Sequence, residues 1–191
     1  MVEMYSNKIE EILLDLEDGH THLAGGSAVG MVISIINSLI KYIANLTLGK
    51  KKYEDVQEKI QEILDSAETL KKDAMKVIDE DKRILENILN SYKLRKENEE
   101  IYQKSLKDAV NFGIEVLNIA FRTLKLSDKI SKVGNKMLES DFKICKYYSY
   151  ASIQASMENI YININEINDN TYKDDVEEKY KKILKDAELL V

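Results

Sequence analysis

The stretch AVGMVISIINSLIKYIANLTL, residues 28–48, is the longest apolar segment of the chain. As an α-helix, which rises ~1.5 Å per residue, it would span ~31 Å, about the thickness of a bilayer core. Lys41 lies within it, and a lysine in the middle of a lipid-facing helix carries a large energetic cost. We therefore expect a central helix that is buried on most sides of a soluble fold, and no membrane span.

The composition around this segment favours helices throughout. The 191 residues include no proline and only 7 glycines, while 44% are apolar and 32% are charged. Sheet proteins turn often and usually need both residue types to do so, and the apolar content is too high for a disordered chain. Because we find neither a linker nor an internal repeat, we expect one all-α domain over residues 1–191.

Charge and cysteine content narrow the function classes. The net charge of −6 argues against a nucleic-acid or membrane-surface protein, because contacts with phosphate groups need clustered Lys and Arg. The single Cys145 cannot form an internal disulfide, and the N-terminus lacks the basic start and apolar core of a signal peptide. We expect a cytoplasmic protein that binds neither nucleic acid nor a membrane.

Apolar residues recur at steps of three and four along nearly the whole chain, which is the period of amphipathic helices. We expect the central helix to begin after a Ser27 cap and to stop at Gly49. Further helices are expected over Ser6–Asp18, Tyr53–Tyr92, Glu97–Lys125, a segment from Ser140 to the Asn-rich stretch 163–170, and Lys173–Val191, with Ser127–Glu139 less regular. The pattern predicts a single-domain bundle of long helices with the last helix on the outside.

One carboxylate interrupts the apolar stripe of the third helix. The stripe consists of Val56, Ile60, Ile63, Ala67, Leu70, Ala74, Val77, Asp81, Leu85, Ile88 and Tyr92. Since every step is three or four residues, Asp81 lies on the face that should enter the core. Asp79 is rotated from it by ~200°, so we expect Asp79 to form a surface pair with Arg83. Only Asp81 needs a special explanation.

The helix after Ser140 also carries polar residues on a regularly spaced face. Its stripe consists of Asp141, Cys145, Tyr148, Ser152, Ala155, Asn159 and Ile162. Burying an unpartnered polar group costs about 1–3 kcal/mol. These groups therefore either satisfy one another across a packed interface or line a pocket for a polar ligand. Cys145 is interpreted as a small core residue.

Gly25, Gly26 and Ser27 open the central helix. A helix N-terminus favours an anion or acceptor, and glycine allows close approach to a ligand, but the same residues also serve as flexible caps. His20 and His22 in the preceding loop have no evident third ligand, so we expect no metal site.

Lys50, Lys51 and Lys52 follow the central helix directly. One interpretation is a solvated cap that complements the helix dipole. The other is a cationic collar that attracts an anionic tail of a substrate.

Seven short segments, taken in order, carry a family resemblance. They are Gly25-Gly26-Ser27, Ala44-Asn45-Leu46-Thr47-Leu48-Gly49-Lys50-Lys51-Lys52-Tyr53, Asp79-Glu80-Asp81, Lys93-Leu94 with Lys96, Gly134-Asn135, Ser140-Asp141 and Asn159-Ile160-Tyr161-Ile162-Asn163. This set resembles the formiminotransferase-cyclodeaminase C-terminal family, which includes free-standing methenyltetrahydrofolate cyclohydrolases and formiminotetrahydrofolate cyclodeaminases. The chain departs from the family pattern at Ala24, Arg95 and Met137.

The resemblance implies an all-helical homodimer with a folate site at or near the subunit interface. The second Asp of the family's Asp-x-Asp motif, the catalytic position, matches Asp81. The family's glycine-rich turn and later polar positions match Gly25, Gly26, Ser27, Asp141, Asn159 and Asn163. The implied substrate is a tetrahydrofolate derivative, with no separate cofactor and no metal.

We hypothesise that Asp81 is a general acid/base at the carbon that bridges N5 and N10 of tetrahydrofolate. Asp141 and Asn159 would orient the pterin or the attacking group, the glycine turn would bind the ligand through backbone N–H groups, and Lys50 and Lys51 would attract the glutamate tail. The residues do not choose between the cyclohydrolase and cyclodeaminase reactions.

The alternative is a non-catalytic helical dimer that retains the fold. In that hypothesis Asp81 and Asp141 are buried partners of Lys41 or Arg122, because buried charges demand partners.

Overall fold

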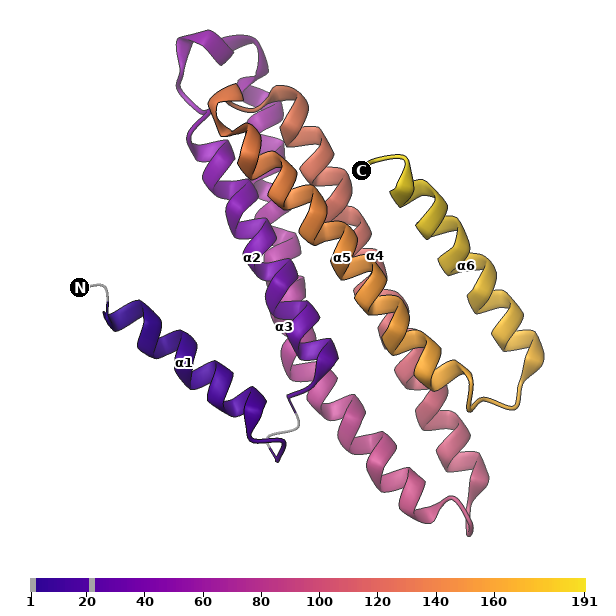
Figure 1. The fold of residues 1–191 in the computed structure, drawn as a ribbon. Helices are drawn as coiled ribbons and strands as arrows, with labels where there is room; N and C mark the ends of the chain where they lie inside the picture. Colours follow the sequence, from indigo (N-terminus) through magenta and orange to yellow (C-terminus); the bar gives the residue numbers. More distant parts are fainter. Residues whose placement is uncertain (1–2, 21–22) are drawn as a thin grey trace.

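The computed structural model describes residues 3–20 and 23–191, and within these ranges the chain forms helices and turns without a strand. The elements are α1 (Glu3–Glu17), α2 (Gly25–Asn45), η1 (Lys51–Val56), α3 (Gln57–Leu94), α4 (Glu99–Val133), η2 (Lys136–Leu138), α5 (Glu139–Ile164) and α6 (Asn170–Glu188). Helices α2 to α5 form an elongated bundle (Figure 1). The all-α prediction is confirmed.

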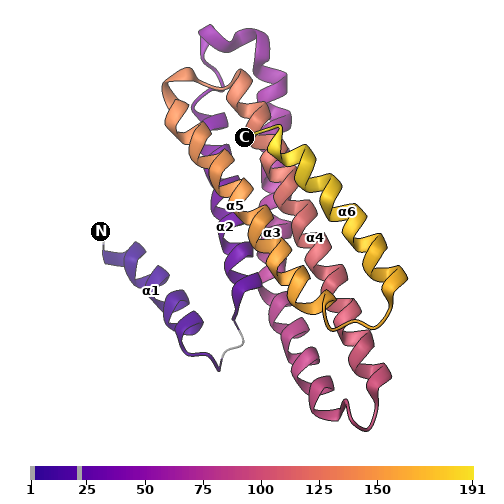
Figure 2. The same ribbon diagram turned by 45° about the vertical axis from the view of Figure 1, so that its right-hand side comes forward.

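The helices of the bundle pack around α4, which contacts α2, α3, α5 and α6. As predicted, the last helix lies on the outside, where α6 packs along α4 and α5 (Figure 2). In contrast, α1 stands apart from the bundle in both views (Figures 1 and 2).

Two apolar clusters extend along the bundle. One contains Ile33 and Leu117, and the other contains Ile40 and Ile130. All four side chains are fully buried. Because inward-facing residues of α2 contribute to both clusters, this helix fixes the position of its neighbours along most of the length of the bundle.

Burial of α2 is nevertheless incomplete. Among the residues that the structure describes, α2 is the one helix long and apolar enough to cross a membrane, and 56% of its most apolar window is buried inside the bundle. Its outward face carries a stripe at alternating steps of three and four, which we call the α2 seam: Val32, Ile35, Leu39, Tyr42 and Leu46. Ile35 is 61% exposed and Tyr42 is 49% exposed. The expected central helix thus leaves one apolar face uncovered.

The expected end of the fourth helix is wrong. Instead of stopping near Lys125, α4 continues to Val133. Leu126 and Ile130 are buried and extend its apolar stripe, so packing keeps this segment helical up to Gly134.

The expected cap of the central helix is also wrong. The helix begins at Gly25 after Ala24, and no side chain caps it. It ends at Asn45, ahead of Gly49, whose φ of +70° turns the chain towards η1. Ser27 therefore lies inside the first turn.

Lys41, the cation within α2, pairs with Glu68 on α3. Lys71 also lies 3.1 Å from Glu68. Hydrogen bonds from Lys41 and Lys71 lower the pKa of Glu68 to about 2. The pairing of Lys41 with Asp81 or Asp141 that the scaffold hypothesis expected is therefore wrong.

Helices α2 and α3 approach each other closely at Gly30, and a substitution at this position tests that contact. A Cβ atom at this position would lie 2.9 Å from the backbone oxygen of Ala74 and 3.1 Å from Val77 Cγ1. We expect Gly30→Ala to lower the free energy of unfolding by about 1–3 kcal/mol, because one helix must move. Gly25→Ala is the control, since its Cβ would meet only Asn159 Oδ1 at 3.6 Å. Urea denaturation of both variants checks this, and equal stabilities would contradict it.

Candidate functional site

Asp81 of α3 binds the first turn of α2. The backbone N–H of Ser27 donates to Asp81 Oδ2 at 2.7 Å. The Ser27 hydroxyl lies 2.9 Å from the same oxygen and 3.2 Å from the carbonyl oxygen of Ile78. Since a hydroxyl has one proton, the shorter contact identifies Asp81 as its main acceptor. The residue that we expected to cap α2 instead holds the inward carboxylate.

Gly26 makes this contact possible. A Cβ atom at position 26 would lie 2.0 Å from Asp81 Oδ1 and 2.5 Å from Asp81 Cγ. No side chain can be accommodated there without displacing the carboxylate. The N-terminus of α2 also directs its positive dipole end at Asp81, which favours the charged carboxylate.

The surroundings of Asp81 act on its pKa in opposite directions. Burial raises the pKa above the ordinary value for an aspartate, because desolvation disfavours the charged form. The hydroxyl and backbone hydrogen bonds from Ser27 oppose that shift. Burial is the larger effect, so Asp81 gains and loses a proton at higher pH than a solvated aspartate. This property suits a group that transfers protons.

Asp81 lines a cavity of about 430 Å³ between the N-terminus of α2 and helices α3, α4 and α5. Its walls consist of Ala24, Gly25, Gly26, Asp81, Ile84, Leu85, Ile88, Tyr102, Leu106, Ala109, Phe112, Gly113, Val116, Ser156, Asn159, Ile162, Asn163 and Glu166. Small-molecule sites typically have this size and this mixture of an apolar wall with few polar groups.

The structure brings most of the predicted site residues together. The cavity is lined by Gly25, Gly26, Asp81, Asn159 and Asn163. Ser27 is fully buried and contacts Asp81. The Ser27 N–H that we expected to bind ligand is therefore occupied by the carboxylate.

Three other predicted site residues lie at the far end of the bundle. Lys50 and Lys51 follow α2, and the length of α2, 21 residues, separates them from Gly25 by about 30 Å. Asp141 lies in the first turn of α5, close to η2. The loop between α4 and η2 binds this same end of α2, because the Asn135 N–H donates to Thr47 Oγ1 at 3.0 Å. Within one chain these three residues do not meet Asp81.

The cavity walls from α4 were missed by the sequence analysis. Tyr102, Phe112 and Val116 reach the site through tertiary packing, and no local motif marks them. The predicted stripe of α5 was partly misplaced, because Tyr148 is 52% exposed and Ile162 is 71% exposed. Cys145 is buried, as predicted, and burial raises its pKa to about 12.

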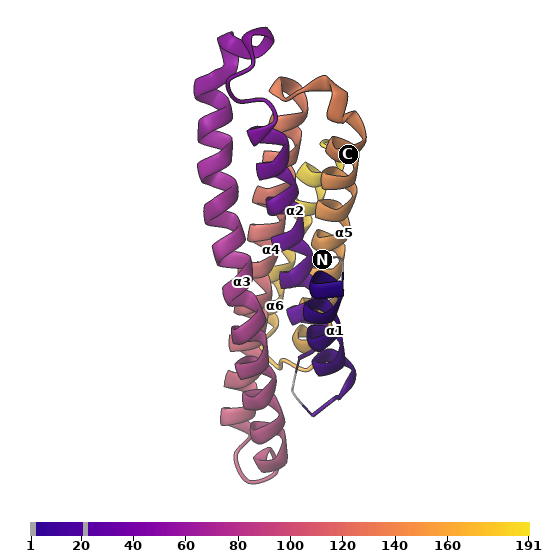
Figure 3. The same cartoon turned by 90° about the vertical axis from the view of Figure 1, so that its left-hand side faces the viewer.

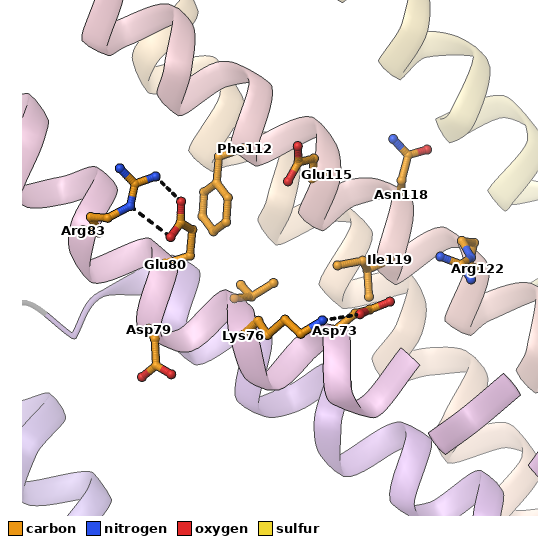
Figure 4. Close-up of a pocket in the computed structure, with 11 residues that line it drawn as sticks. Asp73, Lys76, Asp79, Glu80, Arg83, Phe112, Glu115, Asn118, Ile119 and Arg122 are labelled. Carbon is orange, nitrogen blue, oxygen red and sulfur yellow. Dashed lines mark hydrogen bonds and ion pairs between the residues drawn. The ribbon is translucent and has the colours of Figure 1, made fainter. Parts of the chain in front are cut away.

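A larger hollow of about 890 Å³ lies between α3 and α4 and contains Asp79 and Glu80, the neighbours of Asp81 (Figure 4). The expected Asp79–Arg83 pair is wrong. Arg83 Nε donates to Glu80 at 3.0 Å, and Asp79 points away from it (Figure 4). Lys76 likewise pairs within this hollow at 3.2 Å from Asp73. Its charges largely neutralise one another at the surface.

The structure describes one of the two predicted loop histidines. The side chain of His20 is 91% exposed and lies beside Asp18, whereas His22 lies outside the described residues. Within residues 3–20 and 23–191, no three His, Cys, Asp or Glu side chains form a group that could hold a metal ion.

Known proteins share both the sequence pattern and the fold. The Formiminotransferase-cyclodeaminase family model matches residues 8–182. A methenyltetrahydrofolate cyclohydrolase from Methylorubrum extorquens is 24% identical over 188 residues, which cover 94% of this chain and 89% of the relative.

A solved structure is also similar. The crystal structure of formiminotetrahydrofolate cyclodeaminase from Thermotoga maritima matches with a TM-score of 0.78 and 26% identity, covering 88% of this chain and 81% of that chain. Because the family model spans most of the chain and the solved relative shares its fold, the resemblance is confirmed, and the chain belongs to the formiminotransferase-cyclodeaminase family.

Proposed function

We propose that this protein is an enzyme of folate one-carbon chemistry that acts at the carbon bridging N5 and N10 of tetrahydrofolate. The observation that carries the proposal is the position of Asp81. Ser27 binds one carboxylate oxygen, Oδ2, while the side chain lines a largely apolar cavity. The two relatives named above act as a cyclohydrolase and a cyclodeaminase, and the same carboxylate serves either reaction.

In the cyclohydrolase reaction, Asp81 acts first as a base. Its carboxylate accepts a proton from water as the water oxygen bonds to the methenyl carbon, and its charge stabilises the cationic centre. The bond from that carbon to N5 then breaks, and Asp81 returns the proton to N5. The product is the 10-formyl compound, and one proton from the intermediate hydroxyl is released to solvent.

In the cyclodeaminase reaction, N10 bonds to the formimino carbon of the 5-formimino compound. The formimino nitrogen takes up one proton from solvent, and Asp81 accepts the N10 proton and transfers it to the same nitrogen. With its own hydrogen that nitrogen then carries three and leaves as ammonia, and the methenyl cation remains. Neither sequence of steps requires a group beyond the folate, water and Asp81, and we propose no cofactor and no metal.

The asparagines of α5 are suited to orient the substrate. Asn159 and Asn163 line the cavity one turn apart. The side-chain amide of Asn163 donates to the Asn159 carbonyl at 2.8 Å, which leaves its own oxygen available. Paired donors and acceptors of this kind match the edge of a pterin, while Ile84, Leu85 and Ile88 match its flat faces.

We further propose a homodimer formed through the α2 seam. On α5, which packs against α2, a second set of apolar side chains is exposed: Tyr148, Ala151 and Ile162. Two adjacent exposed apolar helix faces are typical of a protein interface. A second copy that covers both would remove them from water.

An antiparallel arrangement of the two copies explains the separation of the predicted site residues. A parallel pair would bring two Lys50–Lys52 clusters together, and like charges repel. An antiparallel pair places the Lys50, Lys51 and Asp141 end of one copy beside the Asp81 end of the other. The lysines then lie where the negatively charged glutamate tail of a folate would emerge. We also propose a cytoplasmic location, consistent with the reduced Cys145.

Asp81→Asn tests the catalytic proposal. The amide keeps the shape of the side chain but cannot accept the proton, so we expect the rate to fall about 10²–10⁴-fold. The measurement follows loss of methenyl absorbance and release of ammonia in parallel, with methenyltetrahydrofolate and formiminotetrahydrofolate as substrates. The wild type identifies its own reaction. A folded variant with full activity, or a wild type inactive on both substrates, would contradict the proposal.

Ser27→Ala tests how Asp81 is tuned. Loss of the hydroxyl bond removes an interaction that favours the charged carboxylate, so the pKa of Asp81 rises. Because hydrolysis needs the charged form, the rate increases with pH through this pKa, and the rising limb of kcat against pH should move to higher pH in the variant. A limb that stays in place or moves to lower pH would show that Ser27 does not tune Asp81.

Ile35→Glu tests the dimer. A carboxylate at the centre of the seam should convert dimer to monomer in analytical ultracentrifugation, because burying an isolated charge is very costly. Lys72→Glu, on the exposed side of α3, is the control and should remain dimeric. If the wild type sediments as a monomer at micromolar concentration, the proposed interface is wrong.

A further inference from the structure

Helix α1 is an amphipathic helix whose apolar face is uncovered. The face consists of Ile9, Ile12, Leu13 and the partly buried Leu16, and Ile9 is 59% exposed while Leu13 is 47% exposed. With 15 residues, α1 is at the length where an isolated helix is only marginally stable in water. Such a helix normally gains its stability by packing its apolar face against something else.

The position of α1 relates it to the proposed dimer interface. Seen from the left of Figure 1, α1 lies in front of the lower parts of α2 and α5 (Figure 3), and Figure 1 shows that it stands off from them. A loop of seven residues, 18–24, joins it to α2 and can span at most ~25 Å. Any second copy that covers the α2 seam therefore lies within reach of α1.

We propose that α1 is an arm that packs its apolar face on the second copy of the chain. This inference rests on the dimer proposed above. Its seat is the outer edge of the partner's α5 near that helix's N-terminus, where Ile144 and Tyr147 are exposed by 39% and 59%.

Charge favours this seat. The arm carries five acidic residues, Glu3, Glu10, Glu11, Asp15 and Glu17, against the single cation Lys8. The proposed seat lies at the end of the bundle that carries Lys50, Lys51 and Lys52. Lys143 beside it already pairs with Glu139 at 2.9 Å, so the positive charge that meets the arm is that of Lys50, Lys51 and Lys52. In the antiparallel dimer, the acidic arm of one copy meets this basic end of the other.

The nearest seat on the arm's own chain is less favourable. The lower part of α5, close to the start of α2, exposes Glu158, and Glu166 is exposed in the turn that follows the helix. Packing there would bring like charges together. The apolar face of α1 thus has a seat of opposite charge on a second copy, whereas the seat on its own chain carries like charge.

Two adjacent leucines allow a matched test by sedimentation of the full chain. Leu13 lies on the apolar face, and Leu14, which is 56% exposed, is rotated from it by ~100°. Leu13→Glu should raise the dimer dissociation constant about 100-fold, because each dimer loses two buried leucines. Leu14→Glu should leave it unchanged. Equal effects of the two substitutions would overturn the proposal.

A thiol cross-link identifies the chain on which the arm packs. One tagged chain carries Leu13→Cys and a differently tagged chain carries Tyr147→Cys, and the two are mixed and treated with a short bismaleimide. We expect a cross-linked product that contains both tags. The wild type is the control, since its buried Cys145 should not react.

A chain that carries both cysteines gives the opposing outcome. If the cross-link in this variant forms only within one chain, or if the mixed dimer forms without any cross-link, the arm does not pack on the partner. Methenyltetrahydrofolate hydrolysis by the same samples is recorded separately. Loss of the cross-link with intact activity and dimer therefore contradicts only the arm, whereas inactive wild-type protein contradicts the proposed function.

Discussion

The contact between the first turn of α2 and Asp81 fixes both the fold and the site. Two groups of Ser27 reach one carboxylate oxygen at 2.7 and 2.9 Å. The other oxygen lies so close to Gly26 that a Cβ atom would be 2.0 Å away. Helices α2 and α3 can therefore meet at this point only with glycine in that position. The close approach of α2 and α3 also forms part of the wall of the cavity in which a ligand can reach Asp81.

A periodic pattern was enough to find Asp81. The stripe of α3 continues over many turns, and tertiary packing rarely rotates so long a helix away from its apolar phase. The role of Ser27 could not be found in the same way. Serine at a helix start is usually a cap, and its actual partner lies 54 positions away in the sequence. Only the three-dimensional approach of α2 and α3 distinguishes the two roles.

The sequence also did not reveal which residues of α4 line the cavity or which face of α5 is buried. Phe112 and Val116 lie in a stretch of α4 that contains no buried polar side chain, so nothing local marks them as part of a site. In α5, small and apolar residues occur on several faces, and the sequence pattern predicts that the face with Tyr148 and Ile162 points inward. In the structure Tyr148 and Ile162 are exposed. The sequence pattern of a single chain does not distinguish an apolar face that is buried within the chain from one that a second copy would cover in the proposed dimer.

The most direct test of the account is a crystal structure of the protein with a slowly reacting methenyltetrahydrofolate analogue. We expect the pterin to lie in the cavity between α2, α3, α4 and α5, with the bridging carbon ~3–3.5 Å from a water or carboxylate oxygen at Asp81. A ligand that instead occupies the hollow between α3 and α4, with Asp81 still bound to Ser27 and remote from the reacting carbon, would contradict it.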